Sequence, residues 1–82
     1  MNIDAVRQLA GQMDANAGQI DQLMATLTSA LESTEWIGPD RERFLADWQN
    51  THVAQLTAVA NSLRDAAKAA MQNADDQEQA SA

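Results

Sequence analysis

Few side chains in this sequence could carry out covalent or redox chemistry. The 82 residues include no Cys, no Tyr and a single His, His52. Without Cys there is no disulfide framework, zinc ribbon or redox pair, and one His cannot build a metal site unaided. The phosphate-binding patterns G-x-x-x-x-G-K-[ST] and G-x-G-x-x-G are also absent from the sequence. We therefore expect a protein that is not an enzyme and uses no cofactor or metal.

The charge balance excludes further classes of partner. The chain has 12 acidic and 5 basic residues, a formal net charge of −7. Nucleic acid and anionic lipid both select for clustered Lys and Arg, so either would repel this chain at long range. No apolar run approaches the roughly 20 residues that span a bilayer. Residues 1–7 contain no apolar segment, so we expect no general secretory signal peptide. From the net charge and the short apolar runs we also expect no nucleic-acid partner and no membrane span.

Apolar and small residues recur through the first half of the chain at steps of four and three. The series is Val6, Ala10, Met13, Ala17, Ile20, Met24, Leu27 and Leu31. It predicts a helix over about residues 2–34, with Asn2 as its N-cap. Leu9 and Leu23 each lie one position before a member of the series. They widen the apolar face toward that of a bundle helix.

The second half repeats the pattern and predicts a second helix over about residues 39–74. Pro39 after Gly38 suits the first helical turn. The connection over residues 35–38 is so short that the helices must be antiparallel neighbours. Residues 76–82 have no large apolar side chain, so we expect a flexible acidic tail after a hairpin over residues 1–75. The predicted apolar face of the second helix comprises Leu45, Trp48, His52, Leu56, Val59, Leu63, Ala66 and Ala70, flanked by Phe44, Val53, Ala60, Ala67, Met71 and Ala74.

Two helices cannot cover apolar faces this wide. Small residues would let the two backbones approach closely, namely Ala10, Ala17, Ala60, Ala66, Ala67 and Ala70. Larger side chains would then point outward, among them Leu9, Leu23, Phe44, Trp48 and Leu56. A small chain often completes its core by oligomerising, so we expect an all-α antiparallel helix-turn-helix hairpin that forms a four-helix bundle as a dimer. The predicted helix and dimer contacts are Val6, Leu9, Met13, Ile20, Leu23, Leu27, Phe44, Trp48, Leu56, Val59 and Leu63.

The connection itself carries a motif. Trp36-Ile37-Gly38 lies near the midpoint of the chain, between two helical patterns of nearly equal length. Gly can supply the positive φ of a tight reversal, and Trp can cover the end of the hairpin. With this W-x-G turn, and Phe44 and Trp48 after it, the sequence from residue 2 to about 76 resembles the WXG100 (ESAT-6-like) proteins of type VII secretion.

That resemblance implies a function. The chain would be synthesised in the cytoplasm, pair with itself or with another WXG100 protein, and be secreted by the ATPase of a type VII (ESX) system without a signal peptide. The family's export signal has the form Tyr-x-x-x-Asp/Glu, and the nearest fit here places Met71 and Asp75 at its two ends. Because the Tyr is missing, the resemblance implies that this chain is the member of a dimer that lacks the export signal.

Other interpretations of these residues remain open. Trp36 and Gly38 could form the corner of any helical bundle, and the chain could be a cytoplasmic scaffold or adaptor that dimerises without export. His52 is expected to be a hydrogen-bonded interface or core residue, with a pH-sensitive switch as the alternative. Trp48 and Phe44 are expected to be core or dimer contacts, with a ligand pocket as the alternative.

Overall fold

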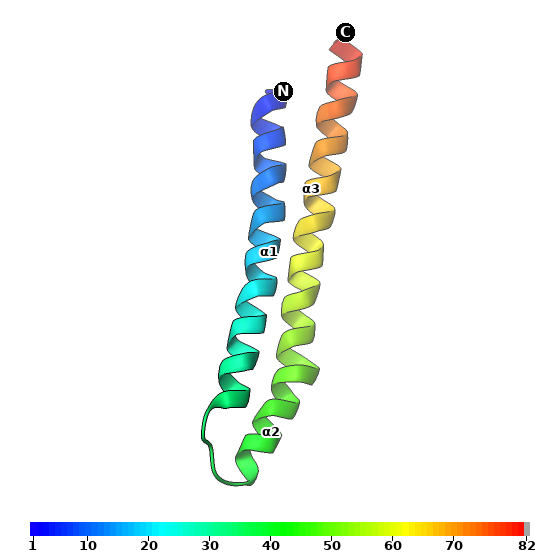
Figure 1. The fold of residues 1–82 in the computed structure, drawn as a ribbon. Helices are drawn as coiled ribbons and strands as arrows, with labels where there is room; N and C mark the ends of the chain where they lie inside the picture. Colours follow the sequence, from blue (N-terminus) through cyan, green and yellow to red (C-terminus); the bar gives the residue numbers. More distant parts are fainter. Residues whose placement is uncertain (82) are drawn as a thin grey trace.

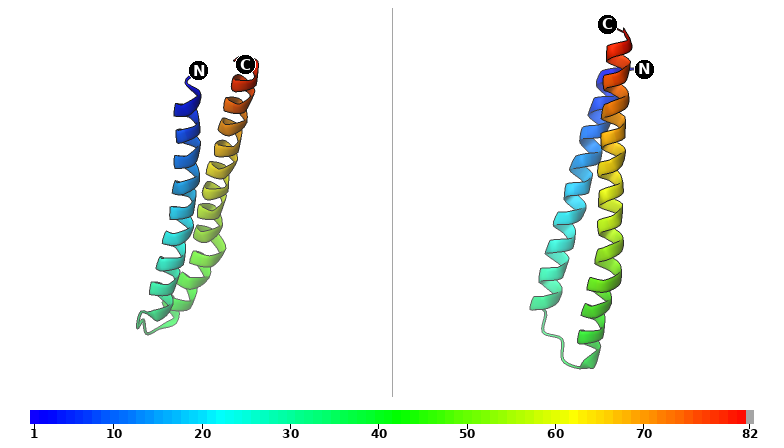
Figure 2. Two further views of the ribbon diagram at one scale, coloured as in Figure 1. Left: turned by 45° about the horizontal axis from the view of Figure 1, so that its top comes forward. Right: turned by 90° about the vertical axis from the view of Figure 1, so that its right-hand side faces the viewer.

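The computed structural model describes residues 1–81 as a helical hairpin. Its elements are α1 (Ile3–Ser33), α2 (Pro39–Asp47), the π-helical turn η1 (Trp48–His52) and α3 (Val53–Ser81). The last three follow one another without a break and form one long helix, which runs back alongside α1 (Figures 1 and 2). No strand occurs in this part of the chain. The predicted all-α hairpin is confirmed.

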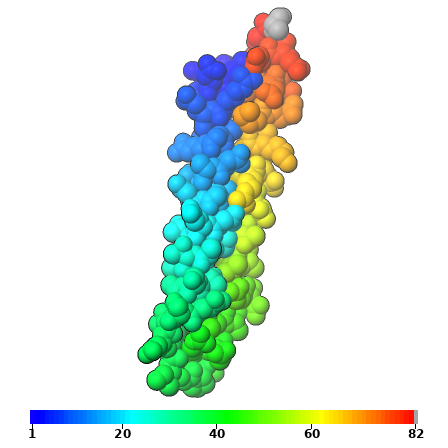
Figure 3. Space-filling model, viewed as in Figure 1, coloured from blue at the N-terminus to red at the C-terminus, as the bar shows by residue number. Residues whose placement is uncertain are grey.

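The hairpin is a rod. Its principal extents are 65 × 17 × 11 Å and its radius of gyration is 18.6 Å. A globular domain of this length would have a radius of gyration of about 12 Å. Figure 3 shows the two helices in contact along most of their length. Because the smallest extent is only 11 Å, the two helices form a single layer. Both flanks of the helix pair therefore face outward.

Local chemistry fixes the ends of α1 and the start of α2. The side chain of Asn2 accepts a hydrogen bond from the Ala5 N–H at 3.0 Å, so Asn2 is the N-cap of α1. At the other end, the Thr34 N–H donates to the Ala30 carbonyl at 3.0 Å. Gly38 has φ 125°, in the left-handed region that glycine tolerates, and Pro39 opens α2. The observed α1 ends within one residue of the predicted 2–34 at each side.

The centre of the hairpin is a seam of small residues. The buried side chains are Ala10, Ala17, Met24, Ala60, Ala67 and Ala74, all 8 % exposed or less. They repeat every seven residues on each helix, so they form one stripe along α1 and one along α3. Alanine lets helix backbones approach closely because it extends so little beyond the backbone. This close approach places the larger apolar side chains, apart from Met24, at the sides of the seam.

The π-helical turn shifts the apolar face of the second helix by one position. The expected face continued through His52, Val59 and Ala66, but these three are exposed. The inward positions are instead Val53, Ala60 and Ala67. Val53 was expected at the margin, whereas Ala60 and Ala67 were expected both to flank the face and to allow close approach of the helices. A π turn holds about one residue more than an α turn, so every later residue lies one position further round. The prediction was wrong for these three positions, because a regular helical period was assumed through η1. Leu56, Leu63 and Ala70 of the expected face are half-buried.

The C-terminal end also differs from the prediction. Residues 76–82 were expected to form a flexible tail, but α3 continues to Ser81; residue 82 lies outside the described residues. Gln72 donates to Asp76 at 2.9 Å and Gln77 donates to Ser81 at 3.4 Å, both four residues apart along the helix. Such pairs stabilise helices in the absence of apolar packing. Composition alone did not indicate them.

Candidate interaction surface

The W-x-G turn is held by one aromatic contact and one hydrogen bond. The rings of Trp36 and Phe44 lie with centroids 5.4 Å apart. Arg41 Nη2 donates to the Glu32 carbonyl oxygen at 3.1 Å, which ties the start of α2 to the end of α1. Trp36 nevertheless remains 38 % exposed, and Ile37 beside it is 98 % exposed. The turn therefore leaves two large apolar side chains exposed at one end of the rod.

One flank of the hairpin is closed by polar bridges. We call it the polar flank; on α1 it carries Arg7, Asp14, Asp21 and Thr28, which recur every seven residues. Arg64 on α3 forms an ion pair with Asp21. The Trp48 indole Nε1–H donates to Thr28 Oγ1 at 2.7 Å. These contacts join the two helices in their middle and near the turn.

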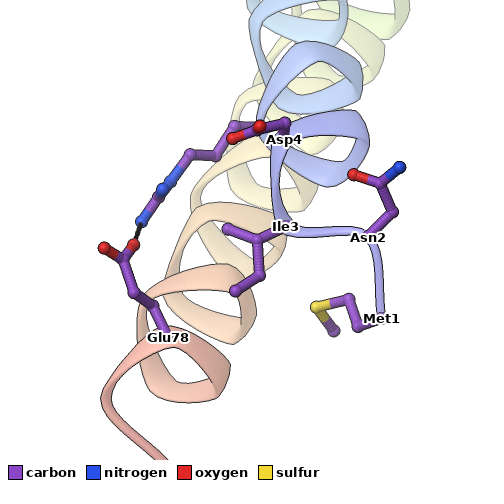
Figure 4. Close-up of a pocket in the computed structure, with 6 residues that line it drawn as sticks. Met1, Asn2, Ile3, Asp4 and Glu78 are labelled. Atoms are coloured by element: carbon purple, nitrogen blue, oxygen red, sulfur yellow. Dashed lines mark hydrogen bonds and ion pairs between the residues drawn. The ribbon is translucent and has the colours of Figure 1, made fainter. Parts of the chain in front are cut away.

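Arg7 closes the polar flank at the paired ends. Its Nη2 donates to Asp75 Oδ1 at 2.9 Å and also forms an ion pair with Glu78. The hydrogen bonds to Asp75 and then to Glu78 raise the pKa of the Arg7 guanidinium. The pair with Glu78 lies at an open hollow between the helix ends (Figure 4). The lining residues are Met1, Asn2, Ile3, Asp4, Arg7 and Glu78.

The opposite flank is apolar. In an α-helix, two residues along the chain turn the side-chain direction by about 200°. Leu9 therefore lies on the side opposite Arg7, and Leu23 on the side opposite Asp21. The side chains of Leu9 and Leu23 are 48 % and 61 % exposed. We call this surface the apolar flank; its residues are Leu9, Met13, Asn16, Ile20, Leu23 and Leu27 on α1, and Leu56, Val59, Leu63, Ala66 and Ala70 on α3.

The charges of the helix pair avoid the apolar flank. Between Leu9 and Leu27 the only charged residues of α1 are Asp14 and Asp21, both on the polar flank. On α3, Arg64 faces Asp21, and the helical period turns Asp65 and Lys68 further from the apolar side. The middle of the apolar flank is therefore uncharged on a molecule of net charge −7.

The predicted contact residues divide into two groups. Val6, Met13 and Ile20 on α1, and Trp48, Leu56 and Leu63 on the second helix, are half-buried against the opposite helix. By contrast Leu9, Leu23, Leu27, Phe44 and Val59 are 43–61 % exposed. The hairpin therefore uses half of the predicted set internally and leaves the other half uncovered.

The export-signal-like residues lie on the polar flank. Met71 is 38 % exposed and lines a hollow with Asp14, Arg64, Ala67 and Lys68. Asp75 is engaged by Arg7. The two residues are one helical turn apart and within α3, rather than just beyond its end. His52 is exposed and its ring lies 6.1 Å from that of Trp48.

Sequence reasoning missed three features of this surface. They are the Arg7 bridge, the Thr28–Trp48 hydrogen bond and the uncovered Ile37. The heptad spacing of Arg7, Asp14, Asp21 and Thr28 was a usable signal, because polar residues at that spacing next to an apolar stripe mark a flank. The exposure of Ile37 follows from the turn conformation, which the spacing of apolar residues in the sequence does not indicate.

The described residues show neither a membrane-spanning helix nor a metal site. No helix in residues 1–81 is long and apolar enough to cross a bilayer. Nor does this part of the chain gather three His, Asp or Glu side chains that could hold a metal ion. Comparison of the chain with family models, with curated proteins and with solved structures finds no match.

Proposed function

We propose that this chain is a small non-enzymatic protein of the WXG100 type, which dimerises and is exported by a type VII secretion system. Within that system it is the partner that lacks the Tyr-x-x-x-Asp/Glu signal. The observation that carries the proposal is an uncharged apolar flank on a hairpin whose turn is W-x-G. In the dimer, two such flanks pack together as a four-helix bundle.

The large accessible surface of the hairpin supports association with a partner. The hairpin has an accessible surface of 5834 Å². A globular monomer of this mass exposes about 4,800 Å². The excess of about 1,000 Å² is close to the roughly 800 Å² that each partner buries in a protein interface of standard size. One partner hairpin would therefore bring the surface back to that of a globular protein.

The turn supports a recognition role beyond the corner of a bundle. Trp36 contacts Phe44 at the turn, yet it stays 38 % exposed, and Ile37 makes the apolar tip larger. Exposed aromatic and aliphatic side chains at one end of a rod suit recognition by the secretion ATPase or by a partner's signal-bearing helix.

The decisive test is secretion with a partner. The chain would be co-expressed with a second W-x-G protein that carries Tyr-x-x-x-Asp/Glu, in cells with a type VII system. We expect a mixed dimer by light scattering, and both chains in the medium. Trp36→Ala should keep its helicity but lose export. The matched control Glu35→Ala removes an exposed polar side chain from the same turn, and we expect it to be exported.

A cytoplasmic adaptor is the second candidate, because Asp75 is held by Arg7 and the Tyr is missing. The two functions differ in one outcome. If the chain forms a dimer with its partner but neither protein leaves the cell, the adaptor function replaces export. If Trp36→Ala is secreted like the unmodified chain, the turn has no role in recognition.

A further inference from the structure

The C-terminal end of α1 carries no cation of its own. The carbonyl groups of a last helical turn have no partners within the helix, and together they bear partial negative charge. The last turn of α1 contains no basic residue, and Glu32 within it is acidic. Thr34 then leaves the helix in an extended conformation, with φ −74° and ψ 132°, so α1 does not end in the left-handed turn that commonly satisfies these carbonyls. The Glu32 carbonyl therefore needs a donor from another part of the chain.

Arg41 supplies that donor from the neighbouring helix. Its Nη2 donates to the Glu32 carbonyl oxygen at 3.1 Å, and its Nη1 donates to the Glu42 carboxylate at 2.8 Å. The Arg41 side chain is only 27 % exposed, against 78 % for Glu42. Arg41 lies in the first turn of α2, where the helix dipole disfavours a cation. Its charge is therefore unfavourable for α2 and favourable for α1, whose C-terminal end it caps.

We propose that Arg41 positions the W-x-G turn for recognition. By capping α1 from α2 it fixes the separation of the two helix ends, and that separation sets where Trp36 lies. The inference rests on the recognition role that the proposed function gives to the turn. It extends the element that recognition requires from W-x-G to the residue three positions after Gly38. Arg41 is a positioning residue, because it acts through Trp36.

The geometry of the turn connects Arg41 to Trp36. Arg41 and Glu32 are nine positions apart along the chain, and Trp36 lies between them. Phe44, whose ring centroid is 5.4 Å from that of Trp36, comes three residues after Arg41 and so lies on the same side of α2. One face of α2 therefore provides both supports of the turn, the cap on α1 and the ring against Trp36.

The connection depends on the cap because its own backbone is permissive. Residues 34–38 lie outside the helices, and Gly38 with φ 125° can readily take other conformations. The contact between Trp36 and Phe44 is compatible with several ring arrangements, so by itself it does not fix the indole. Loss of the cap should therefore release Trp36 while both helices stay formed, since the buried seam of α1 ends at Met24, away from the turn.

NMR of the full chain tests the positioning. In Arg41→Gln, the indole N–H resonance of Trp36 should shift, and the heteronuclear NOE of the backbone amides of residues 34–38 should fall. Helicity by circular dichroism should be unchanged. The indole N–H of Trp48, which donates to Thr28, is the internal control and should not shift.

Two further variants separate the contact from the charge. Arg43→Gln is the matched control, because it removes the same charge from an exposed position on the same helix, and it should leave the turn unchanged. Arg41→Lys keeps the charge and a donor, but a single ammonium group does not reproduce the planar fork that reaches both acceptors, so we expect an intermediate effect. If Arg41→Gln does not fold, Arg41→Lys is compared with Arg43→Lys in the same way.

Export tests whether the position of Trp36 matters. Co-expressed with the second W-x-G protein, Arg41→Gln should still form the mixed dimer and lose export as Trp36→Ala does, and Arg41→Lys should recover part of it. Residues 34–38 that stay as ordered in Arg41→Gln as in the unmodified chain would overturn the inference, as would equal changes in Arg43→Gln. Normal export of Arg41→Gln, with Trp36→Ala retained in the cell, would also overturn it and leave the proposed function intact. If Trp36→Ala is itself exported, the recognition role fails and this inference fails with it.

Discussion

Thr28 and Trp48 show how single residues fix this hairpin. The two residues lie on different helices, and the Trp48 indole N–H donates a hydrogen bond to Thr28 Oγ1 at 2.7 Å. Both side chains are half-buried, so water can replace the bond only in part. The bond lies near the turn and anchors η1 to α1. It explains why an indole ring, rather than an aliphatic side chain, suits position 48.

Thr28→Val should destabilise the hairpin by about 1 kcal/mol, because it keeps the shape of the side chain and leaves the Trp48 N–H without its acceptor. Urea unfolding followed by circular dichroism measures the change. Thr26→Val is the matched control, since Thr26 is exposed on the outer side of α1, and it should change the free energy of unfolding little. Equal losses in both variants would mean that the hydrogen bond contributes nothing.

Arg7→Gln should fray the last turns of α3, because it removes the cation that binds Asp75 and Glu78. Backbone NMR shifts of residues 75–81 should move toward coil values, and high salt should have a similar effect on the unmodified chain. The pKa of Arg7 is raised in the folded chain, so its contribution is complete at neutral pH and is lost only as pH rises through that raised value.

Arg64→Gln serves as the control for that experiment. Arg64 also forms an ion pair across the polar flank, with Asp21, but far from the C-terminal end. It should leave the shifts of residues 75–81 unchanged. If both variants fray α3 to the same extent, the Arg7 bridge has no local role in ordering this end.

At the scale of elements, η1 sets which residues of α3 face α1. Trp48 and Val53 both face α1 although they are five residues apart. Residues at that spacing share one face of the helix because the turn between them is π-helical. The turn therefore aligns the small residues Ala60, Ala67 and Ala74 with the seam of α1. Without it, Val59 would lie inward and hold the backbones further apart.

Deletion of Asn50 should convert η1 to a regular α turn and preserve the hairpin, because Trp48 and Val53 would then be four residues apart. Thermal melts should show no loss of stability. Deletion of Ser62, an exposed residue in the regular part of α3, is the control. It rotates the rest of α3 by about 100° and should lower the melting temperature, because Ala67 and Ala74 leave the seam.

A lower melting temperature for the Asn50 deletion than for the Ser62 deletion would show that η1 does not set the register.

The sequence predicted the elements better than their contacts. Asn2, Gly38 and Pro39 marked the helix ends because capping and backbone geometry are local properties of the chain. The series from Val6 to Leu31 indicated the inward face of α1, with Leu27 replaced by Thr28 near the turn. The face of α3 was wrong at His52, Val59 and Ala66, because nothing in the composition of Gln49 to Thr51 signals a π turn.

The apolar flank overlaps with the predicted contact residues, but its arrangement was not predicted. Leu9, Leu23 and Val59 were expected contacts, and they are exposed. Their gathering on one flank depends on the relative rotation of two helices, which no local pattern specifies. The C-terminal helix was missed for the same reason, since Arg7 reaches Asp75 across 68 residues of sequence.

At the scale of the whole molecule, an open rod of 65 Å should owe part of its stability to association. We expect the melting temperature to rise with protein concentration, because the dimer is favoured by mass action. Circular dichroism melts over a wide range of concentrations measure this. Leu23→Gln should weaken the dependence, since Leu23 is 61 % exposed on the hairpin and is expected to be covered in the dimer.

Gln22→Leu is the opposite change on the neighbouring residue, which lies off the apolar flank. It should leave the concentration dependence as it is. A melting temperature that is the same at all concentrations would show that the hairpin is stable by itself, and the excess surface would then need another explanation.

The placement of the two tryptophans affects how the molecule can be observed. Trp36 and Trp48 both lie in the turn half of the rod, and the sequence has no third Trp and no Tyr. Intrinsic fluorescence therefore reports only on that half. Splaying of α1 from α3 at the opposite end, where Arg7 meets Asp75, would leave the emission spectrum unchanged. Detecting it requires an added label near residue 7 or 75.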